Sequence, residues 1–68
     1  MPRKIRELVA ELESAGFVLV PGGKGSHRKF RHEGFQGSVI LSGRDGDDAY
    51  LYQEKQVRNA LRAIDHES

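Results

Sequence analysis

The chain has 68 residues, 37% of them hydrophobic, with eleven Lys/Arg against ten Asp/Glu and no cysteine; this leaves room for one domain, residues 1–68, and for no deep enclosed cavity. Without cysteine, disulfide scaffolds, thiolate zinc sites and cysteine nucleophiles are excluded. Because no apolar run approaches the roughly eighteen residues of a membrane span, we expect a soluble cytoplasmic protein with a shallow, exposed site and no membrane segment, metal or cofactor.

The first predicted element is an amphipathic helix over residues 3–15. Its start and stop signals are Pro2 and Gly16. Its apolar residues recur at spacings of three and four: Ile5, Leu8, Val9, Leu12 and Ala15. Residues 17–20 are mostly β-branched or aromatic and end at Pro21, which predicts a strand.

Residues 27–32 are predicted to form the second strand, and their alternation determines which side chains face the core. Phe30 needs burial, and a period of two places Arg28 and His32 on its face. The opposite face then holds one imidazole and two cations: His27, Lys29 and Arg31.

The remaining predicted elements are a turn at 33–37, a third strand at 38–42, an acidic loop at 43–48 and a second helix at 53–65. The second helix has its apolar stripe at Val57, Ala60, Leu61 and Ile64. The order α-β-β-β-α predicts an α+β fold with two helices on one face of a three-stranded antiparallel sheet. The other face stays open for a ligand.

The strongest chemical signal lies on that open face. Residues 24–32 contain four of the eleven Lys/Arg and no acid, and His27 directly follows a glycine-rich turn at 22–26. Histidine can move protons near neutral pH, while cations and free backbone N–H groups hold an anion. We therefore expect a phosphate-chain ligand, RNA first, with His27 as the catalytic candidate. The expected RNA contacts are Lys24, Gly25, Ser26, Arg28, Lys29 and Arg31.

Three functions remain open from these residues: an RNA-cleaving enzyme, an RNA-binding module without catalysis, and a protein-binding adaptor. The residues alone favour binding without catalysis. The charge supports RNA, because residues 1–32 hold seven Lys/Arg against three Asp/Glu, whereas residues 33–68 hold four against seven. A Walker loop is excluded because a strand follows the Gly-Lys-Gly-Ser turn. An EF-hand starting at Asp45 is excluded because Tyr50 and Gln56 stand where that motif needs Gly and Glu.

Four features stand together in this chain: the helix end Leu12-Glu13-Ser14-Ala15-Gly16-Phe17, the turn Lys24-Gly25-Ser26-His27, Phe30, and the closing helix from Val57 to Leu61. In this combination, over nearly the whole chain, they resemble the HicA toxins. The resemblance implies a double-stranded-RNA-binding-domain-like fold and a metal-independent endoribonuclease that cleaves messenger RNA, with the family's catalytic histidine at His27. It also implies a HicB-type antitoxin partner that covers the histidine face.

The chain departs from this family pattern after the third strand. Many relatives continue there with a basic segment, whereas this chain has an acidic loop with Asp45, Asp47 and Asp48. Only Lys55 stands near the start of the last helix, where duplex-RNA-binding domains carry a lysine cluster. We therefore expect single-stranded or translated RNA rather than duplex RNA as the ligand.

Overall fold

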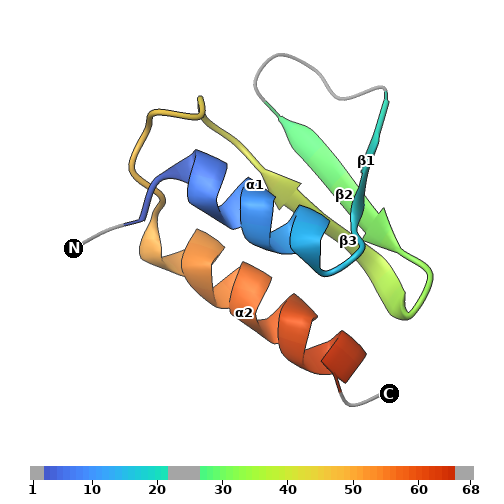
Figure 1. Cartoon of the computed structure of the whole chain (residues 1–68). Coiled ribbons are helices and arrows are strands. Elements are labelled where there is room, and N and C mark those ends of the chain that lie inside the picture. Colours follow the sequence, from blue (N-terminus) through green and yellow to red (C-terminus); the bar gives the residue numbers. More distant parts are fainter. Residues whose placement is uncertain (1–2, 22–26, 66–68) are drawn as a thin grey trace.

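The computed structural model describes residues 3–21 and 27–65 and has two layers, a sheet and a pair of helices (Figure 1). Its elements in chain order are α1 (Ile5–Ser14), β1 (Val18–Val20), β2 (Arg28–His32), β3 (Phe35–Leu41) and α2 (Leu51–Asp65). The strands form one antiparallel sheet in the order β1-β2-β3. The predicted α+β architecture and element order are therefore confirmed.

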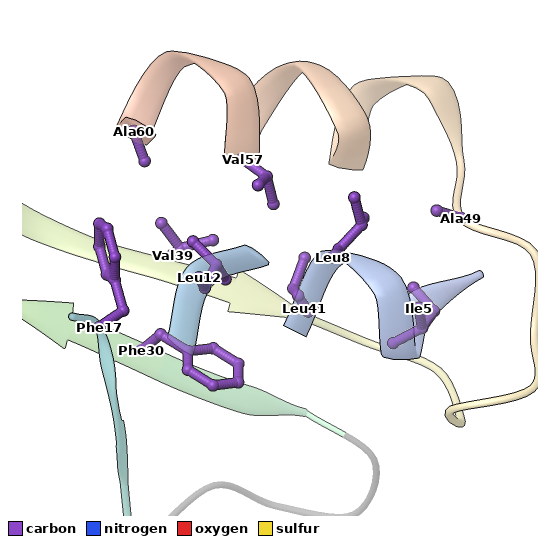
Figure 2. Close-up of a cluster of buried hydrophobic side chains, with 10 residues drawn as sticks. All are labelled: Ile5, Leu8, Leu12, Phe17, Phe30, Val39, Leu41, Ala49, Val57 and Ala60. Atoms are coloured by element: carbon purple, nitrogen blue, oxygen red, sulfur yellow. The ribbon is translucent and has the colours of Figure 1, made fainter. Parts of the chain in front are cut away.

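The core lies between the helices and one face of the sheet, where side chains from both layers meet (Figure 2). Phe30 is 1% exposed at the centre of β2, while its neighbours Lys29 and Arg31 are exposed. The predicted alternation of β2 is thus present. Within the described residues, ten apolar side chains are buried: Ile5, Leu8, Leu12, Phe17, Phe30, Val39, Leu41, Ala49, Val57 and Ala60.

The end of α1 follows directly from Gly16, which adopts φ +99°. In this left-handed conformation the chain turns back, and the Phe17 N–H donates to the Leu12 carbonyl at 3.0 Å while the Gly16 N–H donates to the Glu13 carbonyl at 3.1 Å. This is the Schellman arrangement, which satisfies carbonyls that a helix end would otherwise leave without donors. The reversal delivers Phe17 into the core.

The hairpin between β2 and β3 differs from the sequence prediction. We expected a turn over residues 33–37, but β3 begins at Phe35 and the turn has two residues. The β2–β3 register shifts between Phe30 and His32. Gly37, at φ +93°, lies in β3 opposite this shift. The glycine that suggested a turn therefore accommodates an irregularity within a continuous strand.

The other boundaries differ from the prediction by one or two residues. β1 begins at Val18, α1 at Ile5 and α2 at Leu51. The early start of α2 is stabilised by Gln53, whose Oε1 accepts the Tyr50 N–H at 2.8 Å. Such a bond satisfies a donor at the start of a helix. Neither described helix is both long and apolar enough to cross a membrane.

Candidate functional site

The face of the sheet opposite the helices combines cations with apolar side chains. Arg31 pairs across the strands with Val18, and Lys29 lies between Val20 on β1 and Ile40 on β3. Val18 is 62% exposed and Ile40 is 48% exposed. We call the surface formed by Val18, Lys29, Arg31 and Ile40 the open-face patch. Cations in one row can follow a phosphate chain, and the aliphatic residues give the sugars and bases an apolar contact.

His27 lies immediately before β2 and is exposed. Its imidazole is therefore not enclosed beneath the helices and is within reach of a large ligand. The prediction that His27 lies on the side of Lys29 and Arg31 rests on continuing the alternation of β2 one residue back. The expected contacts Lys24, Gly25 and Ser26 lie outside the described residues.

Arg28 is placed differently from the other expected cations. Its guanidinium donates to Asp45 Oδ1 at 2.8 Å and to the Gly43 carbonyl at 3.4 Å, and its side chain is 27% exposed. It faces the helix side of the sheet, next to the acidic loop, rather than the open-face patch. Among the expected RNA contacts that the structure describes, Lys29 and Arg31 therefore lie together and Arg28 lies apart.

The acidic loop, residues 43–48, folds back onto the start of α1. The N–H groups of Ile5 and Arg6 donate to the carbonyls of Asp47 and Asp45 at 2.9 and 3.1 Å, and the Asp48 carboxylate lies 2.6 Å from Lys4 Nζ. The loop thus supplies acceptors, and negative charge, where a helix start leaves N–H groups without partners.

The sequence analysis predicted only an acidic loop here and missed its contacts with Arg28 and α1. The opposite charges of the basic strand and of the three aspartates after it suggest a contact, but they do not show which residues pair. Within residues 3–21 and 27–65, no group of three His, Cys, Asp or Glu side chains is arranged to hold a metal ion.

The His32 side chain is held by contacts within the fold. Its Nδ1 accepts the Gly34 N–H at 2.8 Å, and its ring lies 5.0 Å from the Phe17 ring, measured between centroids. The ring thereby closes the hairpin on the helix side of the sheet, as the sequence predicted from its register with Phe30. His32 is thus separated from the open-face patch by the sheet itself.

Comparison with known families gives one finding that covers most of the chain. The model of a family described as "HicA toxin of bacterial toxin-antitoxin" matches residues 5–65. Comparisons with curated proteins and with solved structures give no match. The matched segment runs from the first residue of α1 to the last residue of α2 and contains every element of the fold.

Proposed function

The chain belongs to the HicA toxin family, and from this premise we propose that it is the toxin of a toxin–antitoxin pair, acting as an endoribonuclease that cleaves messenger RNA without a metal ion. One observation carries the proposal. An exposed histidine, His27, stands directly before a strand whose exposed face presents Lys29 and Arg31. These residues provide the two things that the reaction needs, a proton carrier and fixed positive charge.

RNA lies on the open-face patch with its phosphates on Lys29 and Arg31. Among the described residues no aromatic side chain stands on this face, because Phe30 is buried and Phe35 packs on the ring of Phe17, 5.8 Å away. Binding therefore depends on phosphate contacts rather than on base stacking. Such binding is strongly weakened by salt and discriminates little between sequences.

In the reaction, His27 takes the proton from a ribose 2′-hydroxyl, and the 2′ oxygen attacks the adjacent phosphorus. The bond from phosphorus to the 5′ oxygen breaks, which leaves a 2′,3′-cyclic phosphate and a 5′-hydroxyl. The leaving oxygen takes a proton from water, which reaches this exposed site, and the hydroxide that remains takes back the proton held by His27. Lys29 and Arg31 offset the negative charge that develops on the phosphate. His32 takes no part, because the Gly34 N–H occupies its Nδ1 on the other side of the sheet.

A HicB-type antitoxin neutralises the toxin by covering His27 and the open-face patch. The exposed cations Lys29 and Arg31 and the exposed Val18 and Ile40 support this part of the proposal. An acidic, partly apolar protein surface complements them in charge and in hydrophobicity. Since messenger RNA is the substrate, the cytoplasm is the compartment in which the toxin acts.

The test is growth after induction of the chain in a bacterial host, with and without the antitoxin from the neighbouring reading frame. We expect the wild type to arrest growth and to shorten cellular messenger RNA, and we expect the antitoxin to reverse both effects. His27→Ala should be harmless at the same protein level, while the control Lys55→Ala, an exposed lysine on α2, should remain toxic. RNA binding without shortening would support the RNA-binding module instead, and an effect independent of both His27 and RNA would support the adaptor.

A further inference from the structure

His27 is followed by Arg28, the first residue of β2. The register of β2 with β3 begins where Arg28 pairs with Leu41, whereas its register with β1 begins one residue later, where Lys29 pairs with Val20. In the described part of the chain, the start of β2 is therefore held by one neighbouring strand rather than two. Strand ends open more easily than strand centres. The placement of His27 depends on Arg28, because this residue is the point at which the chain enters the sheet.

The side chain of Arg28 anchors this point a second time. Arg28 Nη1 donates to Asp45 Oδ1 at 2.8 Å, and Nη2 donates to the Gly43 carbonyl at 3.4 Å. Both acceptors belong to the acidic loop, which follows β3 and lies at the same end of the sheet as the start of β2 (Figure 1). A planar guanidinium that makes two bonds is fixed in direction as well as in distance. The two bonds therefore tie the first residue of β2 to the acidic loop.

The acidic loop is in turn fixed to α1, which packs in the core. The Arg6 N–H donates to the Asp45 carbonyl at 3.1 Å, and the neighbouring Ile5, whose N–H also bonds to the loop, is only 1% exposed. Within the loop, the Arg44 N–H donates to Asp47 Oδ2 at 2.9 Å, and the Asp47 N–H donates to the Arg44 carbonyl at 3.0 Å. Asp45 thus belongs to a segment of backbone that moves only if its hydrogen bonds to α1 break.

We propose that Arg28 is a positioning residue for His27, because its ion pair with Asp45 holds the start of β2 to the loop and α1 and so keeps the imidazole in place for proton transfer. This inference rests on the proposed function for the role of His27. A displacement of about 1 Å can cost about a hundredfold in the rate of such a step. An exposed ion pair changes an equilibrium by up to about fivefold. Since the Asp45 side chain is 64% exposed, we expect an effect of this size on the cleavage rate.

The experiment compares variants of both partners by two measurements: the single-turnover cleavage rate of RNA bound to excess protein, and the affinity for the same RNA without its scissile 2′-hydroxyl. Asp45→Asn should cleave bound RNA about fivefold more slowly although it binds RNA at least as tightly, because the released Arg28 is a further cation. Arg28→Ala should be slowed to the same extent, and the double variant no further, since both changes remove one interaction. The matched control, Asp48→Asn, removes the same charge from the same loop, but from a carboxylate that pairs with Lys4, so it should cleave at the wild-type rate.

A third measurement reports on the position of His27 without requiring cleavage. The NMR order parameter of the His27 amide should be lower in Asp45→Asn than in the wild type. The order parameter of Lys29 should stay unchanged, because this residue pairs with strands on both sides.

A wild-type cleavage rate in Asp45→Asn overturns the inference, and so does equal slowing of the control Asp48→Asn. Arg28→Ala that binds RNA more weakly but cleaves bound RNA at the wild-type rate would identify Arg28 as an RNA contact and also overturns it. A wild type that never cleaves RNA would refute the nuclease. The order parameter then decides separately whether the ion pair holds His27, and an unchanged value overturns that anchoring.

Discussion

Three glycines near His32 allow backbone strain and side-chain crowding to be separated by single alanine substitutions. Gly16 has φ +99°, and a Cβ there would lie 3.2 Å from His32 Nε2. Gly37 has φ +93° and open space around that position, so alanine there meets strain alone. Gly34 has no positive φ, but its Cβ would lie 3.2 Å from His32 Nδ1, so alanine there meets crowding alone.

The expected losses of folding stability follow from these geometries. A left-handed conformation costs a residue other than glycine about 1–2 kcal/mol, while alanine recovers about 0.4–1 kcal/mol by reducing the entropy of the unfolded chain. Gly37→Ala should therefore destabilise the fold by up to about 1.6 kcal/mol, with a midpoint of about 0.8 kcal/mol. Gly16→Ala should cost about 1 kcal/mol more, because the hydrogen bond from Gly34 and the Phe17 ring keep His32 from moving away. Gly34→Ala should leave the free energy of unfolding nearly unchanged, because the cost of crowding and the gain from the lower entropy of the unfolded chain oppose each other.

The assay is urea unfolding of the three variants and the wild type, followed by far-ultraviolet circular dichroism and compared through the free energy of unfolding in water. The order of destabilisation should be Gly16→Ala, then Gly37→Ala, then Gly34→Ala. A Gly16→Ala variant no less stable than Gly37→Ala would refute the packing of His32 against the end of α1.

The remaining predictions concern the charges and the buried amide. For single-stranded RNA, the log binding constant falls with log salt concentration, and Lys29→Ala and Arg31→Ala should each make this slope less steep by about 0.7, because each removes one phosphate contact. Slopes equal to the wild-type slope would show that these cations do not touch phosphate. Asp45→Asn releases Arg28 and should raise RNA affinity at low salt several-fold. The free energy of unfolding should change by less than about 1 kcal/mol. Weaker RNA binding by this variant would mean that the ion pair supports the site. Gln53→Ala removes the bonds to Tyr50 and Ser42 and should cost about 1–3 kcal/mol in urea unfolding, whereas an unchanged midpoint would show that water replaces the amide.

The layout of the fold was predictable because each element has its own signal in the sequence. Apolar residues at helical spacing and the stop at Gly16 identify α1, and the need to bury Phe30 determines the facing of β2. The start of β3 was not predictable, because glycine serves both turns and irregular strand positions. Only the pairing of Phe35 with His32 shows that Gly37 lies within a strand.

The candidate site was predictable to a similar extent. The exposure of His27, Lys29 and Arg31 follows from strand periodicity and agrees with the structure. The pairing of Arg28 with Asp45 was not predictable, since it depends on how the acidic loop folds onto α1. That contact joins residues seventeen positions apart, and local patterns carry no information about such a distance in the chain.

The most direct test of the central claim is the cleavage rate of a short single-stranded RNA by the purified chain in the presence of EDTA. We predict that the wild type yields fragments ending in 2′,3′-cyclic phosphate and 5′-hydroxyl, and that folded His27→Ala is slower by about 10²–10⁴-fold, the contribution typical of a positioned proton carrier. Equal rates for the two proteins, or cleavage that EDTA abolishes, would contradict the account.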